Sequence, residues 1–327
     1  MQKLKGKVAL VAGSARGAGR GIACMLGEAG ATVYCTARSA RGNLVTKKRP
    51  ETIDDTAEMV TARGGVGIAV RVDHTNPEEV ERLLQRIEKE QGQLDILINN
   101  INGDALHQWK RSWDISLDVG LEILKAAVYS HIVNIHYAVP LMLKNRRGLI
   151  VEITDGDGFY YRGNLYYDLT KVSAIRLAMV FATELRKKNI ASVAITPGFL
   201  RSEAVLESLH VTEANWRDAI RRRPEFAESE TPYFIGKVIA ALAADPKVMR
   251  KTGRVFNSAE LAREYGLTDI DGRFPKIWEW IASSKFRYKK IDDTFYEYFK
   301  MDYDELSKEV EKLKKEIKGS RAAKTNS

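Results

Sequence analysis

The sequence predicts an α/β protein built on a doubly wound parallel sheet of about seven strands, with helices on both faces of the sheet. Three observations lead to this prediction. Short apolar segments alternate with segments of helical period, a glycine-rich turn follows the first apolar segment, and 327 residues suffice for one large α/β domain with an appendage. Alternation of this kind is typical of βαβ units, whose strands run parallel.

Strands are expected where short apolar segments are rich in β-branched residues. The sixth such segment is stopped by Pro197 and Gly198, because proline cannot donate a backbone hydrogen bond to a sheet. A short seventh segment closes the sheet. In chain order the predicted strands lie at residues 7–12, 32–36, 66–72, 94–99, 149–154, 191–196 and 254–256.

Helices are expected between these strands, where apolar residues recur every three or four positions. The clearest start signal is Asn76-Pro77-Glu78-Glu79, an N-cap residue followed by proline and two acids. The predicted helices lie at residues 22–29, 77–91, 117–144, 166–188 and 233–244.

The sheet-forming part of the chain is expected to end near Gly272, which divides the sequence into residues 1–272 and 273–327. Within the first part the pattern loosens at about 199–231, the profile of an excursion rather than of a core element. The second part opens with aromatic residues in a basic stretch. An amphipathic helix is expected at 303–318 and a disordered tail at 319–327.

Composition narrows the functional classes. A hydrophobic content of 44% and a charged content of 29% are those of a globular protein, and no uninterrupted apolar run approaches the roughly 20 residues of a membrane span. We therefore expect a soluble, cytoplasmic protein with no membrane partner. Cys24 and Cys35 are expected in the core, with no metal site. A net charge of +9 indicates an anionic partner, either nucleic acid or a phosphorylated cofactor.

A glycine-rich turn, Gly13-Ser14-Ala15-Arg16-Gly17-Ala18-Gly19, follows the first predicted strand and opens a helix. Glycine lets the backbone approach an anion closely, and the N–H groups and dipole of a helix start favour negative charge. The spacing is G-x-x-x-G-x-G rather than the commoner G-x-G-x-x-G. The residues expected to bind the phosphates of a nucleotide are Gly13, Ser14, Arg16, Gly17, Ala18 and Gly19.

This spacing resembles that of the short-chain dehydrogenase/reductase family, and the resemblance covers about residues 6–270. It implies a Rossmann-type domain that binds a nicotinamide cofactor, with the excursion at 199–231 as a substrate lid. In family members that use NAD, an acid at the end of the second strand binds the adenosine ribose. This chain has Thr36-Ala37-Arg38 there. Arg38 and Arg16 match positions where the family binds the 2′-phosphate, so the resemblance implies NADP(H).

The resemblance implies further cofactor contacts at the ends of later strands. Asp73, with His74 beside it, matches the residue that contacts the adenine ring. The segment Asn99-Asn100-Ile101-Asn102 retains half of the family's Asn-Asn-Ala-Gly motif, although polar residues at strand ends are also common turn formers. The residues that match the segment along the nicotinamide amide are Pro197, Gly198 and Leu200.

Tyr167 and Lys171 are four positions apart in a predicted helix, so both side chains project from one face. A tyrosine placed in this way exchanges a proton with a carbonyl or alcohol oxygen. A free phenol has a pKa of about 10, and the ammonium of a lysine one turn away lowers that pKa. The pair matches the catalytic Tyr-x-x-x-Lys of the family, in which the lysine also contacts the cofactor.

Two positions depart from the family pattern. The family's serine, which hydrogen-bonds the substrate oxygen, is replaced by Asp155, with Thr154 beside it. Three interpretations stay open: a protonated Asp155 acts in place of the serine, Thr154 supplies the hydroxyl, or the chemistry of the site has drifted or vanished. The family's helix asparagine, which orders a relay water, falls near Ala127, and Asn134 lies about two turns away.

The resulting hypothesis is an NADP(H)-dependent carbonyl reductase or alcohol dehydrogenase with a small-molecule carbonyl or alcohol substrate. His131 is a further candidate for the substrate cleft. The alternative is an NADP(H)-binding scaffold or sensor that has lost turnover, and nucleic-acid binding is disfavoured because the sequence holds no recognised nucleic-acid motif. The resemblance also implies a homo-oligomer, a dimer or tetramer, that pairs through the helices after the fourth and fifth strands.

Overall fold

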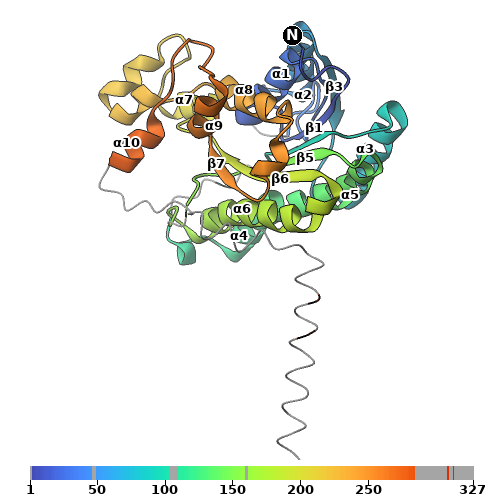
Figure 1. Ribbon diagram of the computed structural model, residues 1–327. Coiled ribbons are helices and arrows are strands. Elements are labelled where there is room, and N and C mark those ends of the chain that lie inside the picture. Colours follow the sequence, from blue (N-terminus) through green and yellow to red (C-terminus); the bar gives the residue numbers. More distant parts are fainter. Residues whose placement is uncertain are drawn as a thin grey trace, which may run out of the picture.

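The computed structural model describes residues 2–45, 49–102, 106, 110–158, 161–283, 308 and 312. They include a seven-stranded sheet in the order β3-β2-β1-β4-β5-β6-β7, in which every neighbouring pair is parallel (Figure 1). The predicted α/β sheet is therefore confirmed. The strands are β1 Val8–Ala12, β2 Thr32–Ala37, β3 Val66–Arg71, β4 Ile96–Asn99, β5 Gly148–Ile153, β6 Ile190–Thr196 and β7 Val255–Asn257.

Helices cover both faces of the sheet (Figure 1). The buried core is divided between the two faces of the sheet. Alternate residues of β1 point to opposite faces, so Ala9 and Val11 belong to one buried cluster while Val8 and Leu10 belong to the other. The first layer consists of α1 Gly17–Glu28, α2 Ile53–Ala62, α8 Pro232–Ala243 and α9 Ser258–Tyr265, and the second of α3 Pro77–Gln91, α5 Ser130–Asn145 and α6 Leu165–Leu185.

The strand order reverses at β1, which lies between β2 and β4. In an open parallel sheet the loops that follow the two strands at such a reversal separate and leave a crevice, where ligands bind. Here those loops are the glycine turn after β1 and the segment that begins at Asn100, after β4. The fold therefore brings together the two motifs that the sequence associates with a nucleotide.

Several helix boundaries differ from the sequence-based expectation. The first helix begins at Gly17, inside the glycine turn, rather than at residue 22. The single helix expected at 117–144 consists of α4 Leu117–Leu124, a π-helical segment Lys125–Tyr129 and α5. The sequence pattern does not predict α2 or α9, since both are short, although Thr52 and Asp55 form a capping box at the start of α2.

The helical run Leu117–Asn145 is, by length and composition alone, apolar enough to cross a membrane, since an 18-residue stretch of it has a mean hydropathy of 1.2. Half of that stretch is buried inside the fold. His131 and Asn134, which lie on it, hydrogen-bond to other buried side chains. These contacts are those of a helix in the core of an α/β domain. Such core helices can be as long and as apolar as membrane-spanning helices.

The excursion at 199–231 carries α7 Glu203–Ser208 and two short 3-10 helices, Trp216–Arg221 and Pro224–Glu228. It has a small hydrophobic cluster of its own, separate from the clusters on the sheet. The buried members of this excursion cluster are Val211, Trp216, Ala219 and Phe226.

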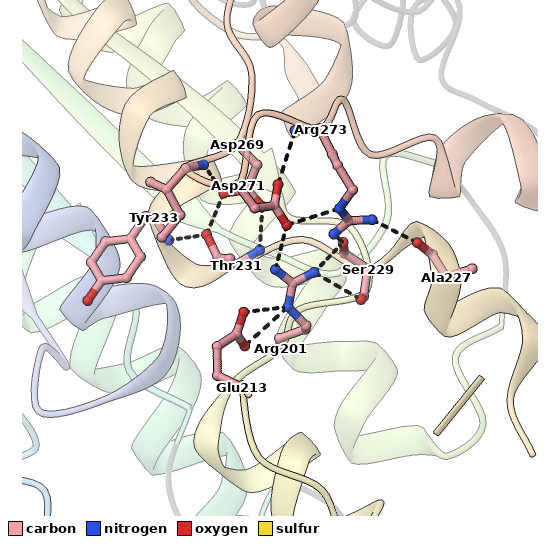
Figure 2. Close-up of polar contacts among 10 residues, drawn as sticks. Arg201, Glu213, Ala227, Ser229, Thr231, Tyr233, Asp269, Asp271 and Arg273 are labelled. Atoms are coloured by element: carbon pink, nitrogen blue, oxygen red, sulfur yellow. Dashed lines mark hydrogen bonds and ion pairs between the residues drawn. The ribbon is translucent and has the colours of Figure 1, made fainter. Parts of the chain in front are cut away.

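The buried side chain of Arg201 ties the two ends of the excursion together (Figure 2). Its guanidinium donates to the Ser229 carbonyl at 3.0 Å and to Asp271 at 3.1 Å, and it lies 4.4 Å from the centre of a Trp216 ring. Arg273 donates to the same Asp271 at 2.9 Å and to the same Ser229 carbonyl at 3.0 Å. The turn around residue 271 thus clamps the excursion to the body.

The chain after Gly272 continues along the excursion. Within it, α10 Ile277–Ser283 buries Ile277. Of the helix expected at 303–318, only Lys308 and Lys312 are among the described residues, and both are helical and exposed. The rest of that helix and the expected tail at 319–327 lie outside the described residues.

Candidate active site

The glycine turn lies against the chain that follows β4. Gly13 has a φ of +84°, and a Cβ atom there would lie 2.8 Å from the Asn100 carbonyl oxygen. A Cβ atom at Gly19 would lie 2.0 Å from the Gly13 carbonyl oxygen, to which the Asn100 side chain donates at 3.0 Å. Both positions require glycine because two backbone segments meet there.

The N-terminus of α1 holds a carboxylate. The Gly17 N–H donates to Glu203 of α7 at 2.8 Å, and Arg20 lies 3.7 Å from the other oxygen of that carboxylate. The start of a helix attracts anions through its free N–H groups and its dipole. Glu203 therefore occupies the kind of position that a cofactor phosphate would take, and the turn fits a phosphate.

The other residues of the turn contribute mainly backbone. The Ser14 side chain is buried and lies 3.4 Å from the Thr36 carbonyl oxygen, and Ala18 is buried as well. Arg16 is the N-cap residue of α1, and its half-buried side chain does not cap the helix.

Arg38 and Asp73 follow β2 and β3, side by side at the edge of the crevice. Thr75 donates to Asp73 through its N–H at 2.9 Å and its hydroxyl at 2.8 Å. Partial burial raises the pKa of Asp73, but these hydrogen bonds and the positive charge of Arg38 outweigh it and hold the pKa below its ordinary value. Asp73 is therefore an ionised turn residue beside Arg38.

Tyr167 and Lys171 lie on α6, as the sequence predicts, and each has a partner from another element. The Tyr167 hydroxyl donates to Asp155 Oδ2 at 2.6 Å. The Lys171 ammonium donates to Asn102 Oδ1 at 2.5 Å and lies 5.7 Å from the centre of the Tyr167 ring. Burial lowers the pKa of Lys171 to about 8, although the charge of Asp155 acts in the opposite direction.

Asp155 and Thr154 point in different directions. The Thr154 side chain is buried, and its hydroxyl donates to the Lys171 carbonyl at 2.8 Å. The hydroxyl therefore anchors α6 to the end of β5. Of the two side chains considered for the serine position, Asp155 is the one that contacts Tyr167 in the structure.

Arg162, which no sequence motif singles out, fixes the loop between β5 and α6. Its guanidinium donates to the carbonyl oxygens of Asp155 at 2.5 Å and Gly158 at 3.0 Å, and to Asp168 of α6 at 3.0 Å. Asn164 caps α6 by accepting from the Tyr167 N–H at 2.9 Å. These contacts set Tyr167 opposite Asp155.

His74 and Asn99 are buried beneath the crevice. Asn134 donates to Asn99 Oδ1 at 2.9 Å, and its own oxygen lies 2.7 Å from His74 Nδ1. The second ring nitrogen of His74 lies 2.9 Å from the Thr36 hydroxyl. Burial lowers the pKa of His74 to about 4, so its ring is neutral. With both nitrogens engaged, His74 supports the strand ends, and its polar atoms do not face the crevice.

The same network continues to a buried acid on β5. Asn99 Nδ2 donates to Glu152 Oε1 at 2.6 Å, and His131 Nδ1 lies 2.6 Å from Glu152 Oε2. The other His131 nitrogen lies 3.0 Å from the Ile101 carbonyl oxygen. His131 is therefore inside the domain, behind the loop that follows β4.

Neither position considered for the family's relay asparagine carries out that role. Ala127 is buried in the π-helical segment, and the Asn134 side chain is engaged by Asn99 and His74. The amide that contacts Lys171 belongs instead to Asn102, the fourth residue of the Asn-Asn-Ile-Asn segment.

The segment Pro197–Leu200 lies against Glu230 at the far end of the excursion. A Cβ atom at Gly198 would lie 2.8 Å from Glu230 Oε2, and Leu200 forms an isolated β-bridge with Glu230. The Ser258 hydroxyl donates to Glu230 at 2.7 Å. Burial raises the pKa of Glu230 to about 8, despite that hydrogen bond. The segment expected along the nicotinamide is thus joined to the excursion.

A cavity of about 430 Å³ lies beside the start of α6. Ser112 in its wall accepts from the N–H of Leu165, the first residue of α6. Its lining residues are Lys110, Arg111, Ser112, Trp113, Tyr161 and Gly163. In the part of the chain that the structure describes, no cluster of three or more His, Cys, Asp or Glu residues could hold a metal ion, and Cys24 and Cys35 are buried thiols.

Comparison with known proteins gives consistent matches. The family model described as short chain dehydrogenase matches residues 7–210. Dehydrogenase/reductase SDR family member 1 of Mus musculus is 34% identical over 277 residues, 83% of this chain and 85% of the relative. A 3-oxoacyl-[acyl-carrier-protein] reductase of Synechocystis is 28% identical, over 79% of this chain and 97% of the relative. A short chain dehydrogenase structure from Mycobacterium thermoresistibile superposes with a TM-score of 0.70 at 21% identity, over 89% of this chain and 96% of that chain.

Proposed function

Because the chain belongs to the short-chain dehydrogenase/reductase family of oxidoreductases, we propose that it reduces a carbonyl group, or oxidises the corresponding alcohol, with NADP(H) as cofactor. The observation that carries this proposal is the contact of Tyr167 with Asp155 at 2.6 Å, beside the buried ammonium of Lys171. An ionisable phenol, a second oxygen and a cation thus converge at the end of the sheet where the family binds its cofactor.

In the proposed reaction the cofactor supplies or accepts the hydride, and the chain handles the proton. The Tyr167 hydroxyl donates its proton to the substrate oxygen during reduction. The Lys171 ammonium stabilises the phenolate that remains, because the two groups lie on one face of α6. Asn102 holds that ammonium in place.

Asp155 takes the position of the usual serine in this proposal. The Tyr167 hydroxyl donates to Asp155 Oδ2 at 2.6 Å, within the range of a strong O–H···O bond. A protonated Asp155 carries a second hydrogen of its own, so a substrate oxygen that enters between the two groups would accept one hydrogen from Tyr167 and one from Asp155. The same feature motivates the alternative function, a cofactor-binding sensor without turnover, because an ionised Asp155 would repel a developing oxyanion.

Oxidation of NADPH in the presence of a panel of carbonyl compounds distinguishes these functions. The panel includes a 3-oxoacyl thioester, since one relative is a 3-oxoacyl-[acyl-carrier-protein] reductase. It also includes ketones that carry a carboxylate, because Lys110 and Arg111 line the cavity. Tyr167→Phe is expected to lose turnover and keep cofactor binding. Tyr166→Phe is the matched control, because that ring packs on Gly120. Binding of NADPH without any turnover that depends on Tyr167 would favour the sensor.

The proposed preference for NADP(H) rests on two arginines and a missing acid. Arg16 opens α1, Arg38 follows β2, and β2 ends at Ala37 without a carboxylate for a ribose. Arg38→Asp is expected to weaken NADPH binding and to strengthen NADH binding, measured by the fluorescence of the bound nicotinamide. Arg82→Asp, at an exposed position on α3, is the control for the change in net charge.

We also propose that the chain forms a homo-oligomer through α4, α5 and α6. In the described structure α4 packs beside α6 (Figure 1), and this layer exposes large apolar side chains, which are commonly covered by a partner. They include Leu117, Leu121, Ile132, Leu165 and Leu169. Leu121→Asp with Leu169→Asp is expected to reduce the mass measured by light scattering to that of one chain.

A further inference from the structure

Glu152 and His131 form a buried pair that the proposed reaction does not itself use. Glu152 is 0% exposed near the carboxyl end of β5, and His131 on α5 is 2% exposed. A carboxylate at such a position is costly unless its charge is balanced and its oxygens are hydrogen-bonded. Both oxygens of Glu152 have partners, Asn99 Nδ2 at 2.6 Å and His131 Nδ1 at 2.6 Å.

The directions of the hydrogen bonds fix how many hydrogens the pair holds. Asn99 donates to Glu152 Oε1, so that oxygen accepts. At the other end the Ile101 carbonyl can only accept, so His131 Nε2 carries a hydrogen. A second hydrogen lies between His131 Nδ1 and Glu152 Oε2. Whichever atom holds that second hydrogen, the pair has a net charge of zero, which suits its complete burial.

The Ile101 carbonyl connects this pair to Lys171. A peptide unit is planar, so a hydrogen bond to the Ile101 oxygen also fixes the N–H and Cα atoms of Asn102. Asn102 Oδ1 accepts from the Lys171 ammonium at 2.5 Å. An unbroken path thus runs from Glu152 through His131 and one peptide plane to the ammonium.

On the basis of the proposed function, we propose that His131 and Glu152 are positioning residues, which hold the Ile101–Asn102 peptide so that Asn102 keeps the Lys171 ammonium beside Tyr167. Neither residue touches the substrate. Glu152 orients the ring of His131, and His131 supplies the donor for the Ile101 carbonyl. A chain without this donor leaves the peptide free to rotate, and Lys171 loses its fixed partner.

Substitutions of Glu152 and His131 separate the effect of the hydrogen-bond donor to the Ile101 carbonyl from the effect of the charge on Glu152. Glu152→Gln keeps an oxygen for Asn99 and presents an amide N–H to His131 Nδ1, so a neutral ring still donates to Ile101. Within the Glu152→Gln background, His131→Gln retains a donor, whereas His131→Met has a similar length and no donor. Starting from Glu152→Gln avoids leaving a buried carboxylate without its partner.

We expect Glu152→Gln to keep most of the wild-type kcat, and the added His131→Met to lower kcat by about 10- to 100-fold, the effect of a small misplacement of a reacting group. The added His131→Gln is expected to recover most of this loss. The dissociation constant of NADPH is measured for the same three variants, so that any change in cofactor affinity is separated from the change in kcat. Equal kcat values for the Met and Gln variants would overturn the proposal.

A second readout does not depend on turnover. This readout is the pH at which the Lys171 amine becomes reactive toward an acylating reagent, measured in a Tyr167→Phe background. Adding Glu152→Gln and His131→Met is expected to raise this pH, because a loosened Asn102 admits water to the ammonium. If this pH does not change, the positioning role of His131 and Glu152 is overturned, even if the chain is a sensor without turnover. If only the proposed function is wrong, the pH still rises but no turnover depends on Tyr167.

The wild-type chain offers a measurement that needs no substitution at the pair. Nitrogen NMR is expected to show a hydrogen on His131 Nε2 throughout the pH range from 6 to 8, because the Ile101 carbonyl requires it. Loss of that hydrogen within this range would contradict the assigned directions and overturn the proposal, whether or not the variants fold.

Discussion

Glu203→Gln is expected to tighten the binding of NADPH, because the Glu203 carboxylate lies where a phosphate of the cofactor would bind. It accepts from the Gly17 N–H at 2.8 Å, at the start of α1, and lies 3.7 Å from Arg20. A bound phosphate needs the same N–H groups and the same positive end of the helix. The carboxylate therefore competes with the cofactor, and a neutral amide competes less.

The size of the effect follows from the two interactions that the charge makes. A hydrogen bond to a charged group contributes about 1.5–3 kcal/mol, and a charge near a helix terminus about 0.3–1 kcal/mol. The Glu203 side chain is 29% exposed, so water screens part of both. A net difference of about 1–2 kcal/mol remains, which corresponds to a decrease of about 5- to 30-fold in the dissociation constant of NADPH.

Calorimetric titration of NADPH into the apo chain measures this constant. Glu207→Gln is the matched control, since it removes the same charge from α7 one turn farther on and contacts Arg49 rather than Gly17. The gain is expected for Glu203→Gln alone and is expected to shrink as salt is added. Equal affinities of the two variants would refute the competition, and a weaker Glu203→Gln complex would show that the carboxylate assists the cofactor.

Three further predictions concern the site and the excursion. Asp155→Ser is expected to keep or raise kcat, because it restores a neutral hydroxyl donor beside Tyr167, and a complete loss of turnover would show that the carboxyl has a specific chemical role. Glu230→Gln tests a pH effect: the folded pKa of about 8 exceeds the ordinary value of 4.5, so the stability that Glu230 contributes is present below about pH 4.5 and lost as the pH rises through 8. The variant should therefore gain stability over wild type above pH 8, by on the order of 5 kcal/mol at most, and urea unfolding at pH 5 and pH 9 would reveal no such difference if Glu230 were ionised throughout. Arg201→Met is expected to lower the free energy of unfolding by about 2–4 kcal/mol, because it removes hydrogen bonds from a buried guanidinium and leaves Asp271 with fewer partners; a loss below about 0.5 kcal/mol would contradict the clamp.

The elements of the fold that follow from the sequence are those with local signals. The third helix is predicted at its observed bounds, 77–91, because Asn76 caps its start and Gly92 ends it in a left-handed conformation. The glycine turn is also predicted from a local signal, because the spacing of its glycines directly after an apolar strand spans only a few residues. The proposed catalytic pair, Tyr167 and Lys171, also lies within about one turn of helix.

Contacts between distant residues could not be predicted in this way. Glu203 meets Gly17 across 186 positions, and His131 meets Glu152 across 21. A glutamate in an apolar strand has no local partner that would indicate its environment, so only the packing of α5 against the sheet shows that Glu152 meets His131. Asn102 illustrates the same limit, because its motif indicates a turn after β4 and only the fold brings it to Lys171.

The separate cluster beneath the excursion has a consequence for the stability of the fold. Val211, Trp216 and Phe226 belong to a hydrophobic cluster that is distinct from those on the sheet. Substitutions among them change the free energy of a local opening more than that of global unfolding. Substitutions in this cluster are therefore expected to leave the stability of the sheet largely unchanged, and Arg201 is the residue through which the excursion and the turn around residue 271 are joined.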